Sequence, residues 1–163
     1  MASRPRLLLA ALLAVLGAAA AEARLGDTLS DLKKNYGSPV PVTQSRKDQA
    51  FWLFEVDDGQ LMYSVTFNAQ GRSIAEGLKP LKVARFNRST ALDFIDNELA
   101  AIRNSQTKRI LKPREVYQFA GRKYICGDQE YVVIDEPNGY LAIWSQAGVP
   151  SVLVLSPEMM AQM

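Results

Sequence analysis

Two pairs of adjacent carboxylates are the groups in this sequence that come closest to acid–base machinery. Asp57 and Asp58 form one pair, and Asp135 and Glu136 form the other. A glycosidase needs two carboxyl groups that face each other across a cleft, about 5 to 9.5 Å apart. Neighbouring strand residues point to opposite faces, and both pairs flank turn sequences in which Asp is common. We therefore assign these carboxylates to turns and predict no catalytic residues.

Nucleophilic and metal chemistry is restricted by the residue types that the sequence lacks. The 163 residues contain no histidine, which excludes Ser-His-Asp triads, Cys-His pairs and imidazole metal sites. Cys126 is the single cysteine, so internal disulfides and thiolate zinc clusters are excluded. Cys126 ends a short apolar run, so we expect a small buried hydrophobe, the alternative being a reactive thiol. Gly-rich phosphate loops are absent as well, so we predict no cofactor and no metal, and a protein that is not an enzyme.

The N-terminus has the pattern of a secretory signal peptide. Arg4 and Arg6 provide a positive start, and residues 7–21 are an uncharged run of mostly Leu and Ala. Small residues at Ala21 and Ala23 occupy the two positions that a signal peptidase reads. The run is shorter than the roughly 20 residues of a spanning helix, and no lipoprotein cysteine comes after it. We therefore expect a cleaved signal and a periplasmic or extracellular protein.

Cleavage before Arg24 divides the chain into a signal peptide, residues 1–23, and a mature domain, residues 24–163. About 140 residues is the usual size of one domain. The mature sequence contains no other segment apolar enough to span a membrane. We predict a single secreted α+β domain, with halves at residues 24–85 and 86–163.

Two helices are predicted. The first runs over residues 28–36, because Thr28 and Asp31 resemble a capping box and Gly37 stops the apolar stripe. The second starts at Ser89 or Thr90 and ends near residue 104. Its stripe consists of Leu92, Ile95, Leu99 and Ile102.

Residues 50–67 are predicted to form a β-hairpin. Asp58-Gly59 suits a two-residue turn, which places Val56 opposite Leu61 and gives the hairpin one wholly apolar face. Ser73 to Leu78 can supply a third strand. Residues 105–114 are polar and basic, so we interpret them as a connector.

The C-terminal part is rich in predicted strands. They cover residues 115–119, 123–126, 130–135, 140–145 and 151–155. The segments 130–135 and 140–145 are apolar on both faces, which favours a central position in a sheet. Together the elements predict an antiparallel sheet with two main helices, and their order is consistent with a duplicated helix–β-meander unit.

The segment from Gly26-Asp27-Thr28 to Tyr36-Gly37-Ser38-Pro39 resembles the opening of BamE-like (SmpA-like) envelope proteins. Those proteins have a Gly-x-Thr helix start and a Gly-x-Pro helix end, and an antiparallel meander comes next. The β-lactamase-inhibitor-protein fold is similar to a doubled version of that unit. The resemblance implies a role in envelope assembly or protein binding, and it assigns no functional residues.

Basic residues are concentrated in one block of the chain. Residues 79–123 hold eleven basic and four acidic side chains, whereas residues 124–163 hold five acids and no Lys or Arg. A candidate anion-binding patch lies at the end of the second helix and beyond it: Arg103, Lys108, Arg109, Lys112 and Arg114. It would suit anionic lipid or a wall polymer. The alternative is a solvated segment whose charges pair with nearby acids. Nucleic acid is not expected as a partner, because the stretch lacks interleaved aromatics.

A candidate protein interface lies on the less apolar face of the hairpin. Phe51, Leu53 and Met62 would form an apolar strip with a polar border if that face is exposed. They would be core residues if another layer covers it. The sequence thus favours non-enzymatic binding of another envelope or secreted protein, as adaptor, assembly factor or inhibitor. The alternatives are binding of anionic lipid or polymer through residues 103–114 and, less favoured, an enzyme without histidine.

Overall fold

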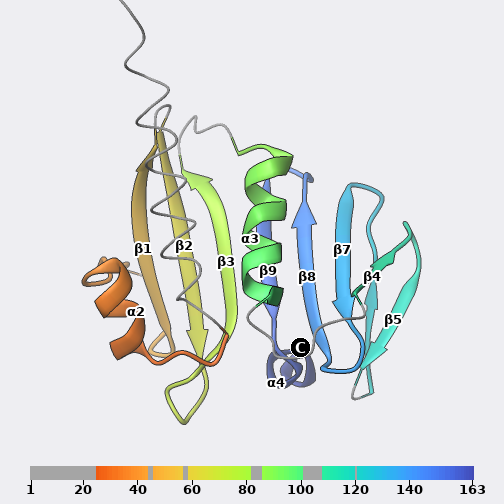
Figure 1. Ribbon diagram of the computed structural model, residues 1–163, viewed down its shortest axis with the longest axis horizontal. Coiled ribbons are helices and arrows are strands. Elements are labelled where there is room, and N and C mark those ends of the chain that lie inside the picture. Colours follow the sequence, from red (N-terminus) through yellow and green to blue (C-terminus); the bar gives the residue numbers. More distant parts are fainter. Residues whose placement is uncertain (1–24, 44–45, 57–58, 82–85, 101–107, 120) are drawn as a thin grey trace, which may run out of the picture.

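The computed structural model describes residues 25–43, 46–56, 59–81, 86–100, 108–119 and 121–163. These parts of the chain are mainly antiparallel β-sheet with three short helices (Figure 1). The helices are α2 (Leu29–Tyr36), α3 (Arg88–Ala100) and α4 (Pro157–Gln162). The strands are β1 (Gln49–Val56), β2 (Gly59–Phe67), β3 (Ser73–Leu81), β4 (Lys108–Leu111), β5 (Val116–Phe119), β6 (Arg122–Ile125), β7 (Glu130–Asp135), β8 (Tyr140–Ser145) and β9 (Ser151–Leu155). The predicted cleavage site at Ala21, Ala23 and Arg24 lies outside the described residues.

Seven of the described strands form one sheet in the order β1-β2-β3-β9-β8-β7-β4. Each neighbouring pair is antiparallel. Strands β5 and β6 pair only with each other in the described chain and form a separate hairpin. β3 and β9 are paired from Ala75–Leu155 to Leu78–Val152, and this contact joins the strands of the first half to those of the second. As predicted from their apolar composition, β7 and β8 lie inside the sheet rather than at its edge.

The predicted fold class is wrong in its balance of elements. The sequence suggested two main helices and a duplicated helix–β-meander unit. The described chain is instead dominated by sheet, and α2 spans only eight residues. The halves also differ in order, because β4 and the β5–β6 hairpin stand between α3 and the later strands. Periodicity identified β5 to β9 one by one, but it carried no information on which of them leave the main sheet.

The sheet carries a separate apolar cluster on each face. We call the face covered by α2 and α3 the helix face; Figure 1 shows α3 lying over β9. Its core contains Leu32, Trp52, Tyr63, Ile95 and Leu99. The opposite surface, which we call the hairpin face, is packed under α4 and the β5–β6 hairpin. Its core contains Ala75, Leu141, Leu155, Tyr117, Cys126 and Met160. Residues of the two clusters alternate along β7, β8 and β9, as the pleat requires.

Helix α2 agrees closely with the sequence prediction. The Thr28 side chain accepts a hydrogen bond from the Asp31 amide at 3.3 Å, and Asp31 accepts one from the Thr28 amide at 3.1 Å, which completes a capping box. Gly37 ends the helix with a φ of 78°. The Gly37 carbonyl also accepts a hydrogen bond from the Trp52 indole at 2.9 Å, so the helix end is tied to β1.

The hairpin β1–β2 has the predicted buried face but a different register. Val56 pairs with Gly59 rather than with Leu61, and Gly59 belongs to β2 rather than to the predicted turn. The pairing is shifted by two residues, and a shift of two leaves every side chain on its expected face. Trp52 and Tyr63 are accordingly buried on the helix face, as expected. Asp57 and Asp58 lie outside the described residues.

The interpretation of residues 105–114 as a connector is wrong in part, because Lys108–Leu111 is the edge strand β4. It pairs with β7 from Lys108–Asp135 to Leu111–Val132. Leu111 is the only one of its four residues that is buried, so the strand lacks the apolar alternation that would have identified it. The second predicted helix is present as α3, but it begins at Arg88, and Asn87 rather than Ser89 or Thr90 caps it by accepting a hydrogen bond from the Thr90 amide at 3.0 Å. The predicted end near residue 104, with Ile102 of the stripe, lies outside the described residues.

The turn between β7 and β8 contacts both the β5–β6 hairpin and α4. Gly139 has a φ of 72°, a conformation that favours glycine. A Cβ at this position would stand 2.6 Å from the Phe119 ring and 3.3 Å from Pro157. Phe119 belongs to β5 and Pro157 begins α4, so three elements meet where glycine has no side chain.

We predict that Gly139→Ala lowers the free energy of unfolding by about 2 to 4 kcal/mol, from backbone strain and overpacking together. Gly148→Ala is the matched control, because its φ is 68° and nothing lies within 4 Å of the added methyl group. Urea denaturation of both variants measures the difference. Equal destabilisation would show that the Phe119 contact carries none of the effect.

Candidate functional site

The predicted interface residues lie together on the hairpin face of β1 and β2. Leu53 and Met62 are cross-strand partners, and Phe51 lies two residues along β1 on the same face. Leu53 is 39 % exposed, and Phe51 and Met62 are partly exposed. None of the three belongs to either core cluster of the described residues. We call these three residues the open strip.

Strand β1 is an edge of the sheet and leaves backbone groups available beside the open strip. The Val40 amide donates a hydrogen bond to the Phe51 carbonyl at 2.8 Å, so Phe51 directs its backbone groups away from β2. Backbone direction repeats every second residue in an antiparallel strand, so Leu53 and Glu55 also direct theirs outward. β2 is the one strand that pairs with β1 in the described part of the sheet. The outer edge at Leu53 and Glu55 therefore has no strand partner there.

The predicted anion-binding patch is largely neutralised in the structure. Lys108 Nζ lies 3.4 Å from Asp96 of α3. Arg109 pairs with Glu115, and its guanidinium lies 2.8 Å from Glu136. These two hydrogen bonds raise the pKa of Arg109.

The remaining patch residues lie in the turn after β4 or outside the described chain. Arg114 Nε lies 3.2 Å from Asp128. The Lys112 amide donates a hydrogen bond to Glu115 at 2.9 Å, and this bond, with those from Arg109, holds the pKa of Glu115 below its ordinary value. Arg103 lies outside the described residues. The acids that pair with Lys108, Arg109 and Arg114 lie in α3, in the segment between β4 and β5, and in the turns after β6 and β7, whereas the Lys112 side chain makes no ion pair with a described residue.

The carboxylates considered for catalysis and Cys126 have structural surroundings. Asp135 is fully buried and accepts a hydrogen bond from the Asn138 side chain at 2.9 Å within the β7–β8 turn. Glu136 is exposed and paired with Arg109. Cys126 is buried in the hairpin-face cluster, and burial raises the pKa of its thiol. These placements agree with turn and core roles.

A buried carboxyl pair is the main feature that the sequence did not reveal. Glu76 of β3 and Glu98 of α3 are 0 % and 1 % exposed, and their carboxyl groups lie against each other, with no N–H or O–H donor among the described residues for Glu76 Oε1 or Glu98 Oε2. Two carboxyl groups in such contact share a proton, because one must donate. Tyr63 donates its hydroxyl to Glu76 from β2, and Leu25 donates its backbone amide to Glu98. Neither glutamate was distinguishable in sequence from the exposed acids around it.

Burial governs the protonation of this pair. Desolvation raises the pKa of Glu76, against the opposing effect of the Tyr63 hydrogen bond. Desolvation and then the neighbouring Glu76 charge raise the pKa of Glu98 well above its ordinary value. Desolvation also raises the pKa of Tyr63. The folded protein therefore holds protons at this contact that the unfolded chain releases.

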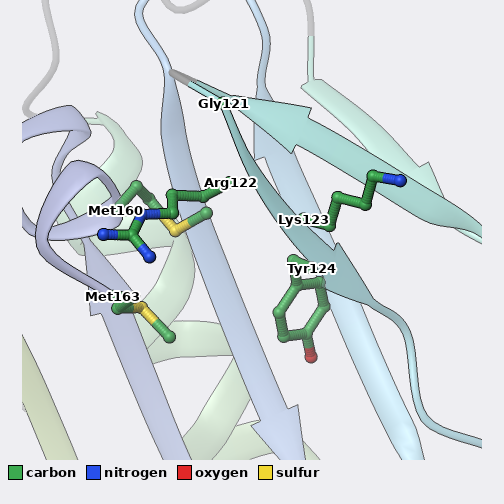
Figure 2. Close-up of a pocket in the computed structure, with 6 residues that line it drawn as sticks. All are labelled: Gly121, Arg122, Lys123, Tyr124, Met160 and Met163. Carbon is green, nitrogen blue, oxygen red and sulfur yellow. The ribbon is translucent and has the colours of Figure 1, made fainter.

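A second set of cations was not singled out from the sequence. Arg122 and Lys123 belong to β6, and neither makes an ion pair with any residue that the structure describes. They line a pocket between the β5–β6 hairpin and α4 (Figure 2). Their position in a basic stretch was visible in the sequence, but which of the basic residues find acidic partners depends on the tertiary fold.

Comparisons with known proteins give fold-level likeness only. No family model matches the chain, and no curated protein matches it. A cysteine-rich secretory protein of Staphylococcus aureus is similar in structure, with a TM-score of 0.45 and 19% identity over 83% of this chain. The match spans 45% of that protein, less than half of its length. A DUF4309 family protein of Bacillus subtilis has a TM-score of 0.41 and 15% identity, over 90% of this chain and 97% of the other.

The predicted resemblance to BamE-like proteins and to β-lactamase-inhibitor protein is wrong. The described chain has a mainly sheet fold with three short helices, rather than two main helices beside an antiparallel meander. The resemblance depended on the start and end of one helix. The capping box and glycine stop that define α2 are general physical signals for helix ends, and they do not specify the fold of the rest of the chain.

The carboxyl pair predicts a pH dependence of stability. A group whose pKa is raised by folding stabilises the protein fully below its unfolded value, and this stabilisation is lost as the pH rises towards the folded value. We expect the free energy of unfolding to fall above pH 4.5, the ordinary glutamate value, by up to about 1.4 kcal/mol per pH unit for one retained proton. Urea denaturation between pH 5 and 9 measures it.

Glu98→Gln is the matched variant, because an amide donates a hydrogen bond to Glu76 without needing a proton. We expect this variant to show a flatter profile and to be more stable than the natural protein at pH 8, by about 1 to 3 kcal/mol. A variant with the same slope as the natural protein would mean that other groups cause the dependence.

Proposed function

We propose that this chain is an exported, non-enzymatic binding module whose partner is another envelope or secreted protein that docks on the open strip. The observation that carries the proposal is an apolar row, Phe51, Leu53 and Met62, on a sheet face that the described helices and hairpin leave uncovered. A clustered set of exposed apolar side chains with polar neighbours is typical of protein interfaces.

The surroundings of the strip support a protein partner rather than a small ligand. Lys79 lies beside Met62 on β3, and Ser64 lies beside Phe51 on β2, which gives the strip a polar border. The backbone edge at Leu53, which pairs with no strand among the described residues, adds hydrogen-bonding groups that an extended segment of a partner recognises. An interface of this kind combines an apolar centre with backbone contacts at its rim.

The proposed function includes export of the chain from the cytoplasm. It is supported by the N-terminal pattern of Arg4, Arg6 and the apolar run before Ala23. The partner of an exported chain is sought outside the cytoplasm. Among the described residues, no helix has both the length and the apolar character needed to cross a membrane.

Site-specific photocrosslinking tests the interface. A photoreactive phenylalanine analogue is placed at Leu53 or at Met62, with Gln118 on the exposed side of β5 as the control position. We expect the same adduct from positions 53 and 62 in the native host, none from position 118, and at least a fivefold loss when Phe51→Asp is added. Adducts independent of position, or none at normal expression, would contradict the proposal.

N-terminal sequencing of the protein recovered from outside the cytoplasm tests export separately. We expect the mature chain to begin at Arg24, because Ala21 and Ala23 are the small residues of the cleavage site. Ala23→Arg should leave the precursor uncleaved. A protein that keeps residues 1–23 in its natural form would exclude a cleaved signal.

A further inference from the structure

A pocket of about 370 Å³ lies between the tip of the β5–β6 hairpin and helix α4 (Figure 2). Its lining residues are Gly121, Arg122, Lys123, Tyr124, Met160 and Met163. Small-molecule sites in proteins have volumes of about 300 to 1,000 Å³. The pocket is therefore large enough for a small ligand but not for a folded partner.

Alternation along β6 separates the side chains of the pocket. Arg122 and Tyr124 are two residues apart and share a face, whereas Lys123 points to the other. Figure 2 shows Arg122 reaching towards Met160 and Met163, with Lys123 directed away from them. Lys123 thus borders the pocket through its backbone, and Arg122 supplies the cation inside it.

Two methionines form the apolar base of the pocket, and the Tyr124 ring forms one of its sides. Met160 is 2 % exposed and belongs to the hairpin-face cluster, and Met163 is largely exposed at the mouth. Methionine side chains adapt to irregular apolar groups. The Tyr124 hydroxyl donates to Glu130 at 2.5 Å, which holds the ring in place and leaves its carbon face to the pocket.

The charge of Arg122 is not compensated within the described residues. Two acids of the neighbouring elements have other partners: Glu130 accepts from Tyr124 and from the Gly127 amide, and Glu158 of α4 accepts from Asn68 at 2.8 Å. This distinguishes Arg122 from Arg109 and Arg114, which are paired with acids. An unpaired guanidinium above an apolar base is complementary to a carboxylate that carries an apolar chain.

We propose that this pocket binds a small anionic amphiphile, a carboxylate with a short apolar chain. The carboxylate pairs with Arg122, and the chain packs against Met160, Met163 and the Tyr124 ring. This binding is independent of the proposed protein interface, because the open strip shares no residue with the pocket.

Octanoate is the probe, and methyl NMR of the purified protein with ¹³C-labelled methionine methyl groups is the readout. We expect saturable shifts of the Met160 and Met163 signals with octanoate, and at least a tenfold weaker response with octanol, which has the same chain without the charge. Met62 on the open strip serves as the internal reference and should not shift.

The matched variants are Arg122→Gln and Lys123→Gln. Each removes one positive charge from neighbouring positions on β6, but only Arg122 directs its side chain into the pocket. We expect Arg122→Gln to weaken octanoate binding about tenfold, the loss of one charge-assisted contact, and Lys123→Gln to weaken it less than about twofold. The methyl spectrum itself reports whether each variant is folded.

Three results would overturn the proposal. One is the absence of a saturable shift at millimolar octanoate in the natural protein. Another is equal weakening by the two variants, which would indicate general electrostatic attraction rather than a site. The third is binding of octanol as strong as that of octanoate, which would indicate an apolar cavity without anion recognition.

Discussion

The pairing of β3 with β9 is the constraint on which the rest of the structure depends. It joins the strands of the first half of the chain to those of the second, so the helix-face cluster extends from β1 to β7 across the junction. Gly77 stands at this junction, where a Cβ would lie 3.2 Å from the Ser64 hydroxyl and from the Val152 carbonyl. α3 then covers the joined strands on one face, and α4 on the other. Without this contact, the helix-face cluster would be divided between the two halves of the sheet.

The buried carboxyl pair lies at the same junction, where Glu98 of α3 meets Glu76 of β3. A buried charge is costly unless it is paired, and here a shared proton replaces a cation. The contact supplies hydrogen bonds but no ion pair. Its contribution to stability depends on pH, because one of the two carboxyl groups must hold a proton. Asp27 and Tyr36 add to the charges and dipoles around the pair, the first from the chain before α2 and the second from α2 itself. The packing of α3 on the sheet is thereby linked to the protonation of the Glu76–Glu98 pair, which lies between the helix and β3.

Whether a basic side chain is paired with an acid depends on which residues the fold brings near it more than on its position in a basic run. In the basic run ending at Arg114, Lys108, Arg109 and Arg114 pair with acids from α3 and from segments between the strands beyond β4. Lys112 of the same run and Arg122, eight residues after Arg114, make no ion pair within the described chain. Both proposed sites lie on the hairpin face. α4 and the β5–β6 hairpin cover part of that face and form the pocket, while the part over β1 and β2 remains open and presents Leu53. One face of the sheet thus provides two surfaces of different chemistry.

The sequence by itself determined the local elements: the capping box of α2, the stripe of α3, the buried face of the first hairpin, and β7, β8 and β9 at their observed bounds. These elements result from side-chain periodicity and helix-end chemistry, which act over a few residues. Only the tertiary structure decided the strand order, the role of β4, the Glu76–Glu98 contact, and which cations keep a free charge. Those features depend on residues distant in sequence, and a pairing energy between distant residues leaves no periodic signal along the chain. The open strip combines both kinds of information, because alternation placed Phe51, Leu53 and Met62 on one face and the layer order left that face uncovered.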